Sequence, residues 1–425
     1  SSRAAPERLT KRKTTAGHCL IIPEKSRNPL HLTSGTAFRP VIPAQCLTYF
    51  RKHPAMKYLI ITNQSYMLWQ FRRELITELL ARGEVVVSTP FVGREKELSG
   101  IGCRLIKTEV DRRGANPAKD YALFRKYRRI IGAEKPDAVI TYSIKPNIYG
   151  GIAAAQAGIP YFVNVQGLGS AFSNRLLAPL VTGMYRHALK KADTVFFENS
   201  GNLERFVEKR VVAADRTVLL PGAGVDTDFY PYRDYPSEEN GLRFLFVGRI
   251  MKEKGVNELF AAAEKLKSEY GDKVHFDVAG FFEDAYSDRV KKLSDSGVIT
   301  YLGFLEDVRP LYESCHCVVL PSYHEGMSNV LLEGASTGRP LITSDIPGCR
   351  EAVIDGKTGF LCRPADTASL YDAMKKFAAM TGDERRKTGL AGREHVLDFG
   401  KYAVVRKTLG AVAHGTTDKN TSGRH

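Results

Sequence analysis

Two glutamates, Glu325 and Glu333, lie eight residues apart on either side of a predicted helix start at Ser328 or Asn329. An apolar, strand-like run at 317–320 precedes them. The free N–H groups and the dipole of a helix N-terminus attract an anion such as a phosphate, and a carboxylate accepts hydrogen bonds from paired hydroxyls. This stretch therefore predicts a ligand with hydroxyls, then phosphates, then hydroxyls, which is the order in a nucleotide-sugar. The alternative is a helix with an ordinary surface glutamate at each end.

A second phosphate-binding pattern lies upstream, where the apolar run 244–247 leads into Gly248 and Arg249 and then into Lys254. Two cations five residues apart after a strand are placed to hold a diphosphate. Both patterns follow an apolar strand, and open α/β sheets bind ligands at the carboxyl ends of their strands. The sequence therefore places both cations and both glutamates at one site. Taken alone, the Gly-Arg pair would also fit a solvated loop.

Alternating apolar strands and amphipathic helices begin at Met56 and continue through most of the chain. Repeated β-α-β units with apolar strands predict parallel sheets covered on both faces. The predicted fold is therefore α/β, with two Rossmann-like domains whose parallel sheets face each other across a cleft. The predicted segments are a disordered basic leader at 1–55, an N-terminal domain at 56–222, a connection at 223–241, a C-terminal domain at 242–390, a helical segment packing across the junction at 391–413 and a disordered tail at 414–425.

The leader is rich in Arg, Lys, Pro, Ser and Thr, begins without methionine, and lacks the apolar core of a secretory signal. A basic, acid-poor leader also fits a transit peptide. Because Met56 directly precedes a strong strand pattern at 57–62, we favour Met56 as the native start and residues 1–55 as read-through of upstream sequence.

The chain has 425 residues, of which 43% are hydrophobic, and this is enough for two separate cores. Its longest apolar patch, 176–181, is far shorter than the ~20 residues that span a bilayer, which predicts a soluble chain. Seven cysteines without a C-x-x-C pair predict reduced thiols, as in cytoplasm. The net charge of +15 is unevenly spread, since residues 1–220 carry +18 and residues 221–425 carry −3. This imbalance predicts an anionic partner, either a phospholipid surface or nucleic acid.

Basic side chains cluster on two predicted helices of the N-terminal domain, at 121–133 and 176–191. They are Arg125, Lys126, Arg128, Arg129, Arg186, His187, Lys190 and Lys191. We expect them to meet anionic lipid head groups or a lipid diphosphate, although a solvated helix face produces the same pattern. The sequence shows neither a basic motif with interleaved aromatics nor a zinc finger, so nucleic acid is not the predicted partner.

A series of motifs runs through the second half of the chain. They are Val247-Gly248-Arg249 with Lys254-Gly255, Ala279-Gly280, Leu302-Gly303-Phe304, Pro321 to Asn329 with Glu333, Gly338-Arg339-Pro340 and Asp345-Ile346-Pro347-Gly348. Together they resemble glycosyltransferase family 4, the retaining nucleotide-sugar transferases of the GT-B fold. In the first half, the runs 143–150 and 164–172 resemble the branch that builds capsule, O-antigen and related bacterial glycans on undecaprenyl diphosphate.

The resemblance implies a role for each matching position. Arg249 and Lys254 would neutralise the donor diphosphate, and Glu325 would bind hydroxyls of the transferred sugar. The implied nucleotide contacts are Glu333 at the ribose, the backbone of Gly326, Met327 and Ser328 at the phosphates, Gly280, Gly303 and Leu305 near the base, and Gly248 beside Arg249. The implied acceptor contacts are Lys145, Asn147, Gln166 and Gly167. Gln166 and Tyr142 stand where many members have histidine, and Asn63-Gln64 stands where many have a glycine pair.

The implied reaction moves a hexose or N-acetylhexosamine, with retention of configuration, from a UDP-sugar to an undecaprenyl-diphosphate-linked saccharide. The N-terminal domain would bind the acceptor, and the C-terminal domain the nucleotide-sugar. Two cations and a helix N-terminus can stabilise a departing diphosphate, so neither a metal ion nor another cofactor is expected. The resemblance places the enzyme in the cytoplasm, peripherally bound to the inner face of the plasma membrane.

Three alternatives compete with parts of this interpretation. A non-hydrolysing UDP-sugar 2-epimerase has the same fold and would need acidic and basic groups to move the C2 proton. A non-catalytic adaptor with a basic face would dock on membranes without needing a nucleotide-sugar. Finally, Asp226-Thr227-Asp228 fits the D-x-D pattern by which GT-A transferases hold a metal, but its Gly-rich surroundings favour an ordinary turn.

Overall fold

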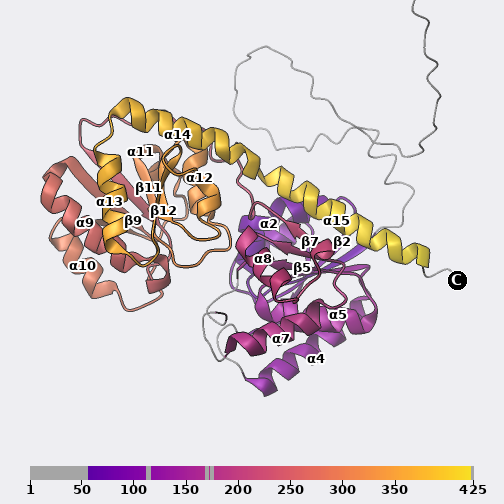
Figure 1. The fold of residues 1–425 in the computed structure, drawn as a ribbon. Helices are drawn as coiled ribbons and strands as arrows, with labels where there is room; N and C mark the ends of the chain where they lie inside the picture. The colour runs from indigo at the N-terminus through magenta and orange to yellow at the C-terminus, as the bar shows by residue number, and fades with distance from the viewer. Residues whose placement is uncertain (1–55, 112–115, 168–171, 173–176, 423–425) are drawn as a thin grey trace, which may run out of the picture. The chain divides into compact units, whose positions relative to one another are not determined.

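Two parallel β-sheets, one after the other along the chain, organise the protein (Figure 1). The structure, a computed structural model, describes residues 56–111, 116–167, 172 and 177–422, and the side chains only as far as 416. The leader predicted at 1–55 lies outside the described residues. Among the residues that are described, none of the helices is both long enough and apolar enough to cross a membrane.

The first sheet has seven strands in the order β3-β2-β1-β4-β5-β6-β7. The strands are β1 (Met56–Ile61), β2 (Gly83–Thr89), β3 (Arg104–Lys107), β4 (Ala138–Tyr142), β5 (Tyr161–Val165), β6 (Thr194–Phe197) and β7 (Thr217–Leu219). The helices of this part are α2 (Ser65–Leu80), α3 (Glu95–Gly100), α4 (Pro117–Glu134), α5 (Gly151–Ala157), α7 (Leu177–Leu189) and α8 (Ser200–Glu208). Every pairing in the sheet is parallel.

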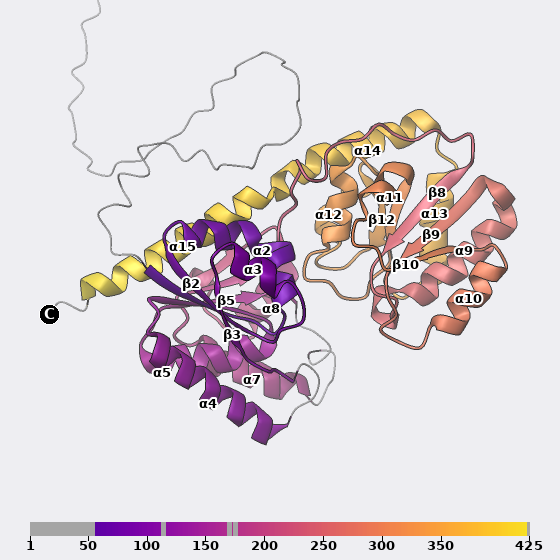
Figure 2. The same ribbon diagram turned by 180° about the vertical axis from the view of Figure 1, so that it is seen from behind.

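Both faces of the first sheet are covered, as apolar parallel strands require. Leu59 and Ile61 of β1 belong to the same buried cluster as side chains of α4, α5 and α7. Tyr58 and Ile60 point to the opposite face and join a cluster with α2 and with the last helix, α15 (Lys401–Ser422). Both views of the ribbon show α4, α5 and α7 together on one side of this sheet (Figures 1 and 2).

The second sheet has six strands in the order β10-β9-β8-β11-β12-β13. The strands are β8 (Leu242–Val247), β9 (Val274–Ala279), β10 (Thr300–Gly303), β11 (Cys317–Leu320), β12 (Leu341–Ser344) and β13 (Gly359–Cys362). Its helices are α9 (Val256–Tyr270), α10 (Ser287–Asp295), α11 (Arg309–Ser314), α12 (Asn329–Ser336), α13 (Thr367–Ala378) and α14 (Gly382–Val396). In both sheets the first strand pairs with the second on one side and the fourth on the other, so the order of the strands across the sheet reverses between β1 and β4 and between β8 and β11. Open α/β sheets bind ligands at such a reversal, beyond the carboxyl ends of the strands.

The sequence patterns do not predict the strands β3, β7 and β13. They have three or four residues each, and β3 and β7 lack a fully buried position. An edge strand this short has neither the length nor the apolar alternation that identifies a strand in the sequence. Pairing with a formed neighbour, rather than local propensity, therefore creates these strands.

Helices run through the two C-terminal boundaries predicted at 390 and 414. The boundary predicted at 390/391 falls inside α14, and the tail predicted to be disordered from 414 is helical as far as Ser422 within α15. Val404, Val405 and Val412 of α15 pack in the cluster of the first sheet, which explains why this polar sequence is helical. At the start of α15, Val225 of the connection pairs with the backbone of Phe399 and Lys401 at 2.9 and 3.0 Å.

Candidate functional site

Lys254 and Glu325 meet at the carboxyl edge of the second sheet. Lys254 follows β8 and Glu325 follows β11, and these are the two neighbouring strands between which the strand order reverses. Lys254 Nζ lies 2.5 Å from Glu325 Oε1, which also accepts a hydrogen bond from Ser322 Oγ at 2.8 Å. The side chains are only 17% and 12% exposed. The structure thus brings together one predicted cation and one predicted sugar-binding carboxylate in a largely dehydrated setting, where charge interactions are strong.

A glycine allows these two loops to approach each other. Gly255 has a φ of +70°, and a Cβ atom there would lie 2.0 Å from the carbonyl oxygen of Pro321. No side chain fits that contact. Gly255 therefore permits the loop after β8 to lie against the loop after β11.

Replacing Gly255 with alanine is expected to lower the free energy of unfolding by about 2–5 kcal/mol, from the left-handed φ and from overpacking. Gly297→Ala is the matched control, because Gly297 has a φ of +72° but nothing within 4 Å of its Cβ position. The control should lose only the conformational part, about 1–2 kcal/mol. Urea unfolding measures the free energy of unfolding of both variants. Equal losses in the two variants would show that the chain around Pro321 makes space for the added methyl group at no energetic cost.

Arg249 lies in the same β8 loop but has a different partner. Its Nη1 atom is 3.3 Å from Glu283 Oε2, and its side chain is 42% exposed. Arg249 thus remains accessible to an anion at the sheet edge, while its ion pair is with Glu283 and not with Glu325.

Glu333 lies within α12, and tyrosines surround its carboxylate. Tyr312 donates its hydroxyl hydrogen bond to Glu333 Oε2 at 2.9 Å, and Tyr230 also hydrogen-bonds this carboxylate. Burial raises the pKa of Glu333 to about 7, while the two tyrosines and the nearby charge of Lys401 act in the opposite direction. The two predicted carboxylates therefore differ, because Glu325 is paired with a cation and Glu333 with neutral donors.

Several backbone groups predicted to bind the nucleotide are already engaged within the protein. The Gly248 N–H donates to Ala279 O at 2.9 Å, and the Gly280 N–H donates to Gly303 O at 2.8 Å. The Ser328 N–H donates to Gly348 O at 2.8 Å, while Ser328 Oγ caps α12 by accepting from the Leu331 N–H. The Ser328 N–H, which is predicted to cap a phosphate, therefore already has a partner within the protein. The N-cap predicted at Ser328 or Asn329 is Ser328.

The remaining predicted donor-side residues lie around the same loops. Met327 is buried in the core of the second sheet, so only its backbone can face a ligand. Gly303 has a φ of +70° and open space around its Cβ position, and Leu305 is half-buried in the loop that follows it. These two positions line the edge beyond β10.

On the first sheet, Gln166 and Gly167 lie directly against the loop of Glu325. A Cβ atom on Gly326 would be 1.9 Å from Gln166 O, and one on Gly167 would be 3.8 Å from Gly326 Cα. The structure thus places this predicted acceptor segment next to the predicted sugar-binding carboxylate. Residues 168–171, which continue the segment, lie outside the described residues.

Lys145 and Asn147 have structural partners instead. Lys145 Nζ pairs with Asp120 Oδ1 at 2.7 Å, with both side chains largely buried. Asn147 is 1% exposed, and its Nδ2 donates to Asn164 O at 2.8 Å. The side chain of Asn147, which is predicted as an acceptor contact, therefore has almost no surface open to a ligand.

Glu198 and Asn199, which follow β6, are not among the predicted site residues. Asn199 Nδ2 donates to Gly326 O at 2.5 Å, and its Oδ1 accepts from the Asn202 N–H as the N-cap of α8. Glu198 Oε1 pairs with Arg72 Nη2 of α2 at 2.5 Å, and its Oε2 lies 3.1 Å from the Cβ position of Gly326. Both residues immediately follow an apolar strand, and this position, which they share with Glu325, is the sequence signal that identifies them.

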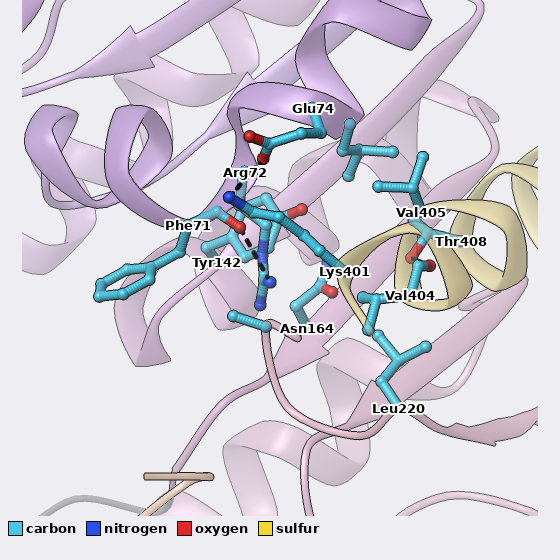
Figure 3. Close-up of a pocket in the computed structure, with 12 residues that line it drawn as sticks. Phe71, Arg72, Glu74, Tyr142, Asn164, Leu220, Lys401, Val404, Val405 and Thr408 are labelled. Carbon is cyan, nitrogen blue, oxygen red and sulfur yellow. Dashed lines mark hydrogen bonds and ion pairs between the residues drawn. The ribbon is translucent and has the colours of Figure 1, made fainter. Parts of the chain in front are cut away.

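A small cavity lies beneath this region, between α2 and α15 (Figure 3). Glu74 of α2 and Lys401 of α15 form an ion pair at 2.8 Å at its wall, and Arg72 and Tyr142 also line it. Its volume of about 10 Å³ has room for roughly one water molecule. The cavity is therefore part of the packing between α15 and α2, and it is too small for a sugar.

The Asp226-Thr227-Asp228 segment forms a turn, as predicted. Asp226 Oδ1 accepts hydrogen bonds from the N–H groups of Asp228 and Phe229 at 3.1 and 3.0 Å. These are the bonds of an Asx turn, in which an aspartate side chain satisfies the backbone two residues ahead. The Asp226 carboxylate therefore has a local structural role.

Comparison with known proteins gives two family matches. The family model described as "Glycosyl transferase 4-like domain" matches residues 68–223, and "Glycosyl transferases group 1" matches residues 241–379. The first range contains the strands of the first sheet except β1, and the second range contains the whole second sheet and all the predicted donor-side residues.

Two named relatives match this chain, one over most of its length and the other over about a third. The N,N'-diacetylbacillosaminyl-diphospho-undecaprenol alpha-1,3-N-acetylgalactosaminyltransferase of Campylobacter jejuni is 27% identical over 376 residues, covering 83% of this chain and 97% of that protein. The capsular polysaccharide biosynthesis glycosyltransferase CapM of Staphylococcus aureus is 28% identical over 156 residues, covering 36% and 40% of the two chains.

Among solved structures, Anabaena Alr3699/HepE in complex with UDP and glucose superposes with a TM-score of 0.70 at 17% identity, covering 84% of this chain and all of that one. At that identity the likeness shows the fold, which is the two-sheet GT-B architecture. The alternating sheets, the site at the strand ends and the two family matches agree, and the chain belongs to the group 1, family 4-like glycosyltransferases.

Proposed function

We propose that this glycosyltransferase moves a hexose or N-acetylhexosamine from a UDP-sugar to an undecaprenyl-diphosphate-linked saccharide, with retention of configuration. The observation that carries the proposal is the Lys254–Glu325 pair, which lies where the strand order of the second sheet reverses. It combines a cation for a diphosphate with a carboxylate for sugar hydroxyls. The Campylobacter jejuni relative, named for an undecaprenol-linked acceptor, supports the choice of acceptor.

In the proposed reaction, the bond between the anomeric carbon and the UDP oxygen breaks as the acceptor oxygen bonds to the same face of that carbon. The acceptor hydroxyl gives its proton to the leaving phosphate oxygen, and UDP departs. Lys254 and the accessible Arg249 stabilise the negative charge that develops on UDP, while Glu325 holds the sugar hydroxyls. Because these two cations supply the required charge, the proposed reaction needs no metal ion or other cofactor.

Basic residues on one side of the first sheet support binding of the enzyme to an anionic membrane surface. The lipid-linked acceptor would lie in that membrane. Arg125, Arg128 and Arg129 are exposed on α4, and Lys190 and Lys191 are exposed just after α7. Both helices cover the same face of the sheet (Figure 1). Arg186 contributes less, since its guanidinium donates to Lys209 O and Arg210 O. We place the enzyme at the inner face of the plasma membrane, where a basic surface would meet anionic phospholipids.

A thermal-shift panel followed by a transfer assay tests the donor and the reaction. UDP at 100 times its Kd should stabilise the protein by about 2.7 kcal/mol, while GDP and ADP at equal concentration should not. With an undecaprenyl-diphosphate saccharide, a UDP-sugar should yield UDP and an α- or β-product that keeps the donor's anomeric configuration, and EDTA should leave the rate unchanged.

The other outcomes of this assay identify the competing functions. If the protein converts the UDP-sugar to its C2 epimer without an acceptor, it is an epimerase and not a transferase. Binding to anionic vesicles without any response to nucleotide would identify an adaptor. An inverted product would overturn retention, while leaving the transferase assignment intact.

A further inference from the structure

Two tyrosines far apart in the sequence converge on the Glu333 carboxylate. Tyr312 belongs to α11, and its hydroxyl lies 2.9 Å from Glu333 Oε2. Tyr230 belongs to the segment that connects the two sheets, and its side chain hydrogen-bonds the same carboxylate. The two rings pack edge to face, with centroids 6.0 Å apart. None of the motifs discussed above includes either tyrosine.

The surrounding structure holds both tyrosines in place. Tyr312 is fully buried, and its carbonyl oxygen accepts from the Nε of the buried Arg339 at 2.8 Å. The carbonyl oxygen of Tyr230 accepts from Ser336 Oγ at 2.6 Å, and Ser336 lies in α12 one turn after Glu333. Hence the connection is fastened to the same helix that carries the carboxylate.

The Glu333 carboxylate can accept more hydrogen bonds than the two tyrosines donate, so it can also bind a ligand. An ionised carboxylate accepts about four hydrogen bonds, and a tyrosine hydroxyl donates one. Two tyrosines therefore occupy about half of the acceptor capacity of Glu333 and leave the remainder for two further hydroxyl donors. Adjacent hydroxyls of this kind occur on a ribose.

We propose that Tyr230 and Tyr312 are positioning residues that aim the Glu333 carboxylate at both ribose hydroxyls of the donor nucleotide and so make the site reject 2′-deoxynucleotides. The inference rests on the proposed function, because it assumes a nucleotide-sugar donor. It adds a role for the connecting segment, which would contribute Tyr230 to nucleotide recognition.

Charged and titratable groups from three elements surround Glu333 and shift its pKa. Tyr312 faces it from α11, Tyr230 from the connection and Lys401 from the start of α15, and all three lower its pKa against the effect of burial. Asp307, just before α11, and Arg309, its first residue, act on Tyr230. Loss of either tyrosine hydroxyl should therefore raise the pKa of Glu333 above about 7 and make the carboxyl neutral over a wider range of pH.

The test is the ratio of the Kd of 2′-deoxy-UDP to the Kd of UDP, measured by calorimetry across pH 5.5–9 on the full chain. The ratio cancels ionisation of the nucleotide phosphates, which the two ligands share. A hydrogen bond to a charged group predicts a ratio of about 10–100 for the wild type above the pKa of Glu333. We expect the ratio to fall toward 1 at low pH, because a protonated carboxyl accepts fewer hydrogen bonds.

In Tyr312→Phe and Tyr230→Phe the plateau ratio should fall at least about threefold, and the midpoint of its pH dependence should move upward. Tyr371→Phe is the matched control, because Tyr371 also donates to a glutamate, Glu269, but between α13 and α9. In Glu333→Gln the pH dependence of the ratio should disappear. A role in stability alone would lower the melting temperature without moving the ratio or its midpoint.

The outcomes separate this inference from the proposed function. If the wild type binds neither UDP nor 2′-deoxy-UDP, the proposed donor is wrong and the inference falls with it. If the wild type prefers UDP and both folded phenylalanine variants keep the same ratio and midpoint, only the role of the tyrosines is overturned. Either phenylalanine variant is sufficient for the comparison if the other does not fold.

Discussion

Replacing Lys254 with alanine is expected to lower kcat for sugar transfer by about 10²–10³-fold, the loss typical of one preorganised electrostatic group. The Lys254 ammonium group is largely buried and lies 2.5 Å from Glu325. In the proposed reaction it faces a diphosphate whose negative charge grows as the glycosidic bond breaks. Loss of this cation removes stabilisation from the transition state and also leaves Glu325 without its ionic partner.

Lys252→Ala is the control for this prediction, because Lys252 belongs to the same turn after β8 but its side chain is exposed. Its transfer rate should stay close to that of the wild type. Rates are compared at saturating donor and acceptor, so that a change in kcat is separated from a change in binding. Equal kcat values for the wild type and Lys254→Ala would remove Lys254 from the catalytic machinery.

Glu198→Ala is expected to destabilise the protein by about 3–5 kcal/mol, because it leaves the guanidinium of Arg72 buried without a counter-charge. The two side chains are only 4% and 9% exposed, and Arg72 also lies 5.4 Å from the centre of the Tyr142 ring. Water cannot replace the lost carboxylate at such a site, so the cost is far larger than for a surface ion pair.

Urea unfolding of three variants tests the role of burial. Asp295→Ala breaks the exposed Lys291–Asp295 pair and should change stability by less than about 1 kcal/mol. Replacing both buried partners, as Arg72→Met with Glu198→Gln, should cost less than Glu198→Ala alone, since no unpaired charge remains. A double variant as unstable as the single one would show that packing, and not charge, dominates at this position.

Sequence alone determined the architecture and half of the candidate site. Runs such as Val85-Val86-Val87 and Phe244-Leu245-Phe246 identify buried parallel strands, because hydrophobic periodicity is a local property of the chain. Parallel strands align their carboxyl ends at one edge of a sheet, so Lys254 and Glu325 could be placed together before any coordinates were known. In the structure, Lys254 Nζ lies 2.5 Å from Glu325 Oε1.

Tertiary structure alone decided which groups remain free for a ligand and which are consumed by folding. The Ser328 N–H is used by Gly348, and Asn147 is enclosed between β5 and α7, although their positions in the motifs suggested otherwise. The partners of Arg72 and Glu333 come from segments 126 and 21 residues away. Helix and strand periodicities relate residues only a few positions apart, whereas these pairings depend on how separate elements pack. Long-range contacts of this kind therefore define the site, and residue types alone do not specify them.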